Sequence, residues 1–335
     1  MLLSLTMEIF ISIASYQDPL LETTIRSAYD NSANPELLRF GICDQSSHPL
    51  DLDLITFSNQ ISYEHIDPHL SQGPCWARAR VQKFYSNEPY YLQIDSHMQF
   101  EQDWDSYMLS YLTKIQNEGS SSHSPPIITC YPRGFDIVDF DNKNFYLQSD
   151  DTSTFTLNFR EDSIFCNGPY SSQITSMTNT EITHGYLIAA GCLFTTGEFV
   201  KEVPYDQSLY FYGEELSIAL RAFTKGFGIY HIPEVPIYHL YTDTSDLKRK
   251  LHWDENEDSS RSVKWHERES ISINRLIDLI DDKVKGTFGL GDIRTLKDFE
   301  YISGINLKEK KIIDAEKAFT SKFLSSLSWK NDIFS

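Results

Sequence analysis

The sequence of 335 residues has few cysteines, and their number and spacing exclude two common architectures. The cysteines are Cys43, Cys75, Cys130, Cys166 and Cys192. An odd number without short paired spacings argues against both a disulfide framework and a structural zinc site. Buried thiols in a reducing compartment fit this usage better, so we expect a cytoplasmic protein.

The sequence also lacks long apolar runs and an excess of basic residues. No run reaches 18 apolar residues, so no membrane span is predicted. The 29 basic residues face 48 acidic ones, and the net charge of −19 argues against general binding to nucleic acid or anionic membrane. Residues 1–16 resemble a secretory signal, but they lack a basic start and Glu8 interrupts them, so we expect no such signal.

The opening of the chain predicts a β-α-β unit. Residues 8–16 and 38–45 are typical of buried strands, and the segment between them predicts a helix with Asp18 as N-cap and Pro19 at its first position. Together with a further strand at 90–95, this unit predicts a doubly wound sheet. Ligands of such sheets bind at the carboxyl ends of the strands.

The rest of the chain is less regular, and residues 134–182 allow no assignment. Further elements are expected as a turn and helix at 71–85, a loop at 116–126, two strands around an Ala-Ala-Gly turn at 184–200, a helix and strand within 212–241, a charged mobile segment at 242–260 and an amphipathic helix at 263–282.

The segment "YYLQIDSHMQF" at 90–100 holds the first candidate for chemistry. In an extended chain, Asp95 and His97 point the same way, so both side chains can reach one divalent metal ion at the end of the strand. A carboxylate with an imidazole suits Mn²⁺. Alone, the pattern favours another interpretation, an Asp that forms a turn beside a surface His.

Two more features are weak by themselves. Glu214 and Glu215 begin a predicted helix, where the helix dipole favours acidic side chains, although one of them can also face a cleft. His239 lies among apolar residues near the end of a strand. Such a His is usually structural unless Asp95 and His97 require a third protein ligand.

The segment "GPCWARARVQKF" brings two arginines to a predicted helix. Arg78 or Arg80 can grip phosphate or ribose oxygens, yet the two side chains diverge on a helix, so at least one is expected in solvent or paired with a surface carboxylate. Small residues at Ala189, Ala190 and Gly191 indicate close approach of the backbone to a ligand or to a neighbouring element.

Together and in this order, the motifs resemble a family of glycosyltransferases that attach α-linked N-acetylglucosamine to protein hydroxyl groups, including hydroxyproline. The matching blocks include "YYLQIDSHMQF", "YFYGEELSIALRAFTKGFGIYHIPEVPIYHLY" and "GLGDIRTLKDFEYISGINL". The resemblance implies an α/β fold of GT-A type, in which a Rossmann-like nucleotide-sugar domain with a mixed, mostly parallel sheet is fused to an acceptor-binding half. It places a catalytic domain at 8–241, with halves at 8–100 and 101–241, and a helical extension at 242–335.

The resemblance also implies the residues of a site. Asp95 and His97 match its metal-binding Asp-x-His, a DXD-like motif, and His239 matches a late histidine that completes the site. Glu214 or Glu215 is expected near the sugar and acceptor. The expected nucleotide-sugar contacts are Ser15, Tyr16, Arg78, Asp95, Ser96, Gly191 and Cys192.

The activity that the resemblance implies is transfer of a sugar, GlcNAc first, from a UDP-sugar with Mn²⁺ or Mg²⁺ and with retention of configuration. The acceptor is a protein Ser, Thr or hydroxyproline, or a glycan. Residues 134–182 and Cys43-Asp44 depart from the family pattern, which leaves the acceptor and the local nucleotide contacts open. A silent sugar- or nucleotide-binding module on the same fold is the alternative; a metal-dependent hydrolase would require further ligands at short spacing that the sequence lacks.

Overall fold

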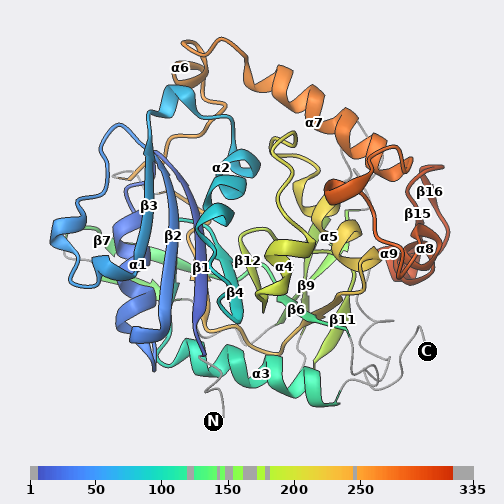
Figure 1. Cartoon of the computed structure of the whole chain (residues 1–335), viewed down its shortest axis with the longest axis horizontal. Helices are drawn as coiled ribbons and strands as arrows, with labels where there is room; N and C mark the ends of the chain where they lie inside the picture. Colours follow the sequence, from blue (N-terminus) through green and yellow to red (C-terminus); the bar gives the residue numbers. More distant parts are fainter. Residues whose placement is uncertain are drawn as a thin grey trace.

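The structure, a computed structural model, describes residues 7–118, 124–141, 144–147, 154–160, 172–177, 182–243 and 247–319. An eight-stranded sheet in the order β11-β13-β6-β12-β4-β1-β2-β3 forms its centre (Figure 1). Its strands are β1 (Ile9–Tyr16), β2 (Leu38–Gln45), β3 (Ile61–Ile66), β4 (Tyr90–Ile94), β6 (Pro126–Thr129), β11 (Thr183–Gly185), β12 (Cys192–Thr196) and β13 (Gly228–His231). Four of the seven neighbouring pairs are parallel, which confirms the predicted mixed, mostly parallel sheet.

Helices cover both faces of this sheet. Side chains along β1 therefore alternate between two cores. Ile9, Ile11 and Ile13 pack with α1 (Leu21–Asp30) and α3 (Trp104–Glu118). Phe10 lies on the other face with α2 (Pro74–Val81), α4 (Glu198–Glu202) and α5 (Glu214–Thr224). Burial on both faces explains why the strand is continuously apolar.

Smaller sheets and C-terminal helices complete the fold. A four-stranded sheet has the order β5 (Met98–Phe100), β14 (Ile237–His239), β7 (Arg133–Asp139) and β8 (Asn144–Leu147). The remaining elements are β9 (Thr154–Phe159), β10 (Ser172–Met177), α6 (Glu255–Asp258), α7 (Trp265–Ile280), α8 (Leu296–Ser303), β15 (Ile305–Asn306), β16 (Lys311–Ile312) and α9 (Ala315–Phe319). β7 to β10 lie in the stretch that allowed no assignment, and Cys166 lies outside the described residues.

Helix α7 runs across the top of the molecule in Figure 1 and leads to α8 at its right edge. Leu276 of α7 and Phe299 of α8 share a core with Leu216 of α5. No helix in the described part of the chain is long and apolar enough to cross a membrane. The domain boundaries at residues 100 and 241 stay a prediction.

Two local expectations were wrong. The first helix begins at Leu21 rather than after Asp18, although one oxygen of Asp18 accepts a hydrogen bond from the amide of Leu20; its other oxygen is used elsewhere, as described below. The charged segment expected to be mobile is packed where it is described: His252 is buried, and Glu257 of α6 accepts a hydrogen bond from the hydroxyl of Tyr16 at 2.7 Å.

Candidate active site

Strand pairing brings Asp95, His97 and His239 together. Asp95 follows β4, His97 precedes β5, and His239 ends β14, whose pairing with β5 sets His239 opposite Met98. One ligand atom from each of the three side chains lies within 4.8 Å of the other two. The two histidine Nε2 atoms are 3.0 Å apart, and Nε2 of His239 is 3.4 Å from Oδ2 of Asp95. The structure therefore unites the three metal ligands expected from the sequence.

Asp18 supports this cluster and was missed as a functional residue. Its Oδ2 lies 2.6 Å from Nδ1 of His97 and accepts a hydrogen bond of 2.8 Å from the hydroxyl of Ser96. A carboxylate that holds one ring nitrogen of a histidine fixes its tautomer and leaves the other nitrogen free to bind a metal ion. The sequence signal, an Asp two residues after a strand, was interpreted as a helix cap.

The donor set fits a divalent metal ion. Asp18 assigns the His97 proton to Nδ1, so the lone pair of Nε2 points toward His239 and Asp95. Burial would raise the pKa of Asp95, but the hydrogen bond from His239 and the charge of Arg78 hold it well below its usual range. Burial lowers the pKa of His239, which favours the neutral ring that a metal requires. One carboxylate and two imidazoles match the preferences of Mn²⁺ and similar ions.

Arg78 connects this cluster to the paired glutamates. Its Nη2 donates a hydrogen bond of 2.7 Å to Oδ1 of Asp95, and its Nη1 donates one to Glu214. The Arg78 side chain is only 5% exposed and that of Glu214 4%, so their ion pair is buried, whereas the Asp95 side chain is 29% exposed. The contact to uridine or phosphate expected for Arg78 stays a prediction, and the structure shows instead that both terminal nitrogens orient carboxylates.

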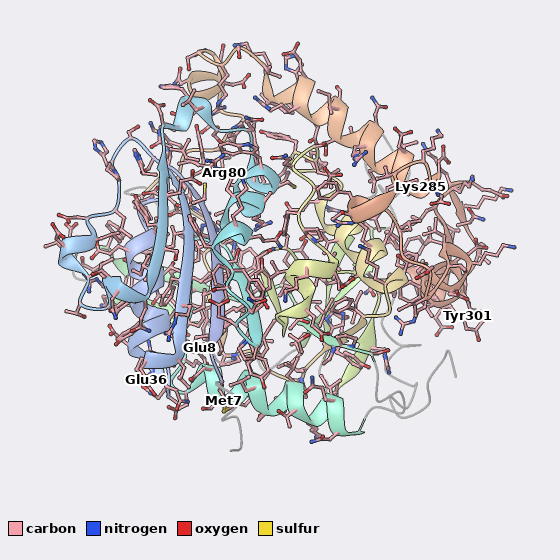
Figure 2. The ribbon with its side chains drawn as sticks, in the orientation of Figure 1. Met7, Glu8, Glu36, Arg80, Lys285 and Tyr301 are labelled. Carbon is pink, nitrogen blue, oxygen red and sulfur yellow. The ribbon has the colours of Figure 1, made fainter. Side chains whose placement is uncertain are left out.

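Arg80 diverges from Arg78, as the helical spacing predicts. It is labelled beside α2 in Figure 2 and donates a hydrogen bond of 2.8 Å from Nε to Glu64 of β3. This confirms that one of the two arginines pairs with a surface carboxylate. The two residues thus offer a buried and a half-exposed ion pair on the same helix.

A cavity of about 380 Å³ opens beside the metal ligands. Its polar lining comes mainly from Arg78, Asp95, Glu214, Glu215 and His239. Aromatic and aliphatic side chains from the segment before β12 and from the start of α5 provide the rest of the wall. An apolar cavity with a few converging charged groups is the usual form of a ligand site.

Gly191 lines this cavity, and its backbone lies so close to Asp95 that no side chain would fit there. A Cβ atom at this position would lie 2.5 Å from Oδ2 of Asp95. Gly191, which was predicted to allow close approach of the backbone to a ligand or a neighbouring element, lets the backbone lie against the metal ligand Asp95. Cys192, in contrast, is buried within β12 and does not line the cavity, and its predicted sugar contact stays untested.

The two glutamates take different partners because Gly213, with a φ of +85°, turns the chain sharply into α5. Glu214 is buried against Arg78. Glu215 accepts hydrogen bonds from the Tyr131 hydroxyl at 3.0 Å and the Ala190 amide at 3.0 Å. Burial, with a smaller contribution from the charge of Glu214, raises the pKa of Glu215 to about 7.

The remaining predicted contacts lie at the adjacent end of β1. Ser15 is buried, and the hydroxyl of Tyr16 is held by Glu257 and Arg261 rather than facing the cavity. Because β1 and β4 are neighbouring parallel strands, Ser15 and Tyr16 end at the same sheet edge as Asp95. Ser96 points its hydroxyl at Asp18, so it braces the cluster through that carboxylate.

Comparison with known proteins decides the family. A family model described as Glycosyltransferase (GlcNAc) matches residues 8–53 and 46–309. The chain belongs to this family. The assignment agrees with the resemblance drawn from the motifs. The region matched to this GlcNAc glycosyltransferase family includes both the metal cluster and the paired glutamates.

Solved structures place this GlcNAc family member among proteins of GT-A fold. A crystal structure of GalNAc-T7 with UDP, GalNAc and Mn²⁺ matches with a TM-score of 0.54 and 14% identity, covering 96% of this chain and 58% of that chain. The chain thus spans a little over half the length of this neighbour. S. aureus TarS 1–349 in complex with UDP-GlcNAc matches with a TM-score of 0.43 and 11% identity, over 82% of this chain and 73% of that one. A search of curated protein sequences found no match.

Proposed function

We propose that the protein transfers GlcNAc from UDP-GlcNAc to a hydroxyl group of a protein or glycan, with retention of configuration and with a bound divalent metal ion. The observation that carries this proposal is the Asp95–His97–His239 cluster, which borders a cavity that also holds Glu214 and Glu215. Family membership supports the sugar, and the fold of a neighbour solved with UDP and Mn²⁺ supports the donor and the metal.

The protein's own residues prepare the site for loss of a diphosphate. Asp95, His97 and His239 would hold the ion, which when bound neutralises negative charge on the leaving group. Asp18 keeps the His97 ring in the tautomer that binds metal, and Arg78 keeps Asp95 ionised and oriented. These bonds exist before any donor arrives, so little reorganisation is needed during the reaction.

Glu215 is the stronger candidate for the acceptor side. Both glutamates line the cavity, but Glu214 is paired with Arg78, whereas Glu215 has a pKa of about 7, suited to accept or return a proton near neutral pH. We propose that Glu215 orients the acceptor hydroxyl while the sugar keeps its configuration by front-face attack. The free buried thiols of the described cysteines support our proposal of a cytoplasmic location.

A donor panel tests this function. The protein is incubated with UDP-GlcNAc, UDP-GalNAc, UDP-glucose and UDP-galactose, with Mn²⁺ or with chelator, and UDP release is measured. We expect release from UDP-GlcNAc that chelator abolishes. Tight UDP-GlcNAc binding without any release, even with protein and glycan acceptors, would instead identify a silent binding module.

A further inference from the structure

An aromatic pocket adjoins the candidate active site and takes no part in the proposed chemistry. It has a volume of about 130 Å³ and is lined by Tyr210, Phe211, Tyr212, Trp253, Trp265 and Glu269. Phe211 and Tyr212 also line the 380 Å³ cavity, so the two spaces share a wall. A group bound in the aromatic pocket therefore lies next to the site of transfer.

The measured rings of this pocket stand at angles to one another rather than in one plane. The planes of Phe211 and Tyr212 meet at 77°, and those of Phe211 and Trp253 at 58°, with ring centres 5.5 and 5.0 Å apart. All three side chains are more than a third exposed, so a ligand can reach them from solvent. Angled ring faces are suited to surround a compact cation, whereas a sugar stacks on a single flat face.

Glu269 gives the aromatic pocket a buried carboxylate without a matching charge. It projects from α7 and is 7% exposed, and no side chain of the described residues pairs with its oxygens; the backbone amides of Phe211 and Tyr212 are the polar groups that act on it. The adjacent Arg268 donates instead to Gln72. Burial raises the pKa of Glu269 to about 7, although the backbone amides of Tyr212 and Phe211 oppose that rise.

A buried carboxylate needs a partner, and aromatic walls favour a positive one. We propose that the aromatic pocket binds the ammonium end of a lysine side chain on the acceptor polypeptide. The side chain's methylenes would contact the rings while the ammonium pairs with Glu269. The chain's net charge of −19 favours the approach of a basic segment. That the lysine belongs to an acceptor rests on the proposed function; binding of the ammonium group does not.

Direct binding tests the pocket without any turnover. The protein is labelled with 5-fluorotryptophan, and Nα-acetyl-lysine methylamide is titrated while ¹⁹F spectra are recorded; Trp253→Phe and Trp265→Phe assign the two pocket signals. We expect a saturable shift of these two signals and not of Trp76 or Trp104. The Nε-acetylated analogue, which has no charge, should produce no shift.

Substitution of the carboxylate sharpens this test. We expect Glu269→Gln to weaken lysine binding at least tenfold, and Glu255→Gln, an exposed change of equal charge on the neighbouring α6, to change it less than twofold. Thermal melts check that both variants fold. Equal binding by Glu269→Gln, or stronger shifts with an acetyl-proline amide or with free GlcNAc than with the lysine ligand, would overturn the proposal.

Acceptor kinetics then separate this inference from the proposed function. Once an acceptor peptide is known, a lysine is moved along it and compared with norleucine at each position. We expect one position where lysine lowers KM about tenfold, while UDP release without acceptor is the same for both peptides. Lysine binding without any UDP release would refute the proposed function alone; UDP release with no preference for lysine at any position would refute the acceptor role of the pocket.

Discussion

The metal cluster and the aromatic pocket each contain an acidic side chain largely withdrawn from solvent, and the surroundings of the two carboxylates differ in the opposite sense. Asp95 lies at the end of a strand, with Arg78 and His239 against its two oxygens, and its pKa is held low. Glu269 lies on a C-terminal helix among aromatic rings, without such partners, and its pKa is raised to about 7. A pre-arranged set of partners indicates a site that is ready before its ligand arrives. A missing partner indicates a site that the ligand completes.

Loss of a metal ligand should have the largest effect on activity. We expect His97→Ala or His239→Ala to reduce UDP release on the order of a thousandfold, since a bound metal ion stabilises the transition state by several kcal/mol. The exposed His48→Ala is the matched control and should remain within twofold. Near-normal release by either cluster variant, measured at saturating Mn²⁺, would remove the metal assignment.

The two arginines of α2 should differ sharply in their effect on stability. Arg78→Ala leaves the buried carboxylate of Glu214 without its ion-pair partner and should lower the free energy of unfolding by about 3–5 kcal/mol. Arg80→Ala breaks a half-exposed pair with Glu64 and should cost at most about 1 kcal/mol. Urea unfolding measures both, and equal losses would contradict the view that Arg78 holds the site together.

Asp18→Asn should weaken the metal site without removing a ligand. Loss of the carboxylate behind a ligating histidine typically reduces metal affinity or activity about 10–100-fold. We expect the Mn²⁺ concentration for half-maximal UDP release to rise by that factor, because the His97 ring loses its fixed tautomer. Asp30→Asn, an exposed change at the end of α1, is the control. A fall in maximal rate with unchanged Mn²⁺ dependence would contradict this role.

Glu269→Gln should stabilise the fold, and by an amount that depends on pH. The folded-state pKa of about 7 lies above the ordinary 4.5, so the unfolded chain releases its proton first as the pH rises. Wild-type stability therefore falls between about pH 4.5 and 7 by a contribution that the variant lacks. We expect no gain at pH 4 and a gain of about 1–3 kcal/mol at pH 8. Chemical unfolding at both pH values measures the gain in the free energy of unfolding, with Glu255→Gln as the control.

Patterns within single segments predicted the sheet and marked Asp95 and His97 as candidate ligands, and the family resemblance was needed to prefer the metal site over a turn. The continuous apolar run of β1 and the Asp-x-His spacing after β4 are local, and the structure agrees with both. His239 followed only from the family resemblance, because its partners come from strands more than a hundred residues earlier. Asp18 was interpreted as a cap because its true partner, His97, is equally invisible to local spacing.

The aromatic pocket was beyond sequence reasoning for the same physical reason. Phe211 precedes α5, Trp253 lies in a segment expected to be mobile, and Glu269 belongs to α7. Nothing in the spacing of these residues relates them to one another. Only the packing of α7 beside the start of α5 brings an acidic side chain of one helix against the rings of another segment.

Pulsed electron paramagnetic resonance of bound Mn²⁺, in the presence of UDP, tests the central claim most directly. The account predicts coupling of the manganese electrons to two histidine nitrogens in the wild type and to one in His239→Ala. The absence of nitrogen coupling in a sample that shows full Mn²⁺-dependent UDP release would contradict it.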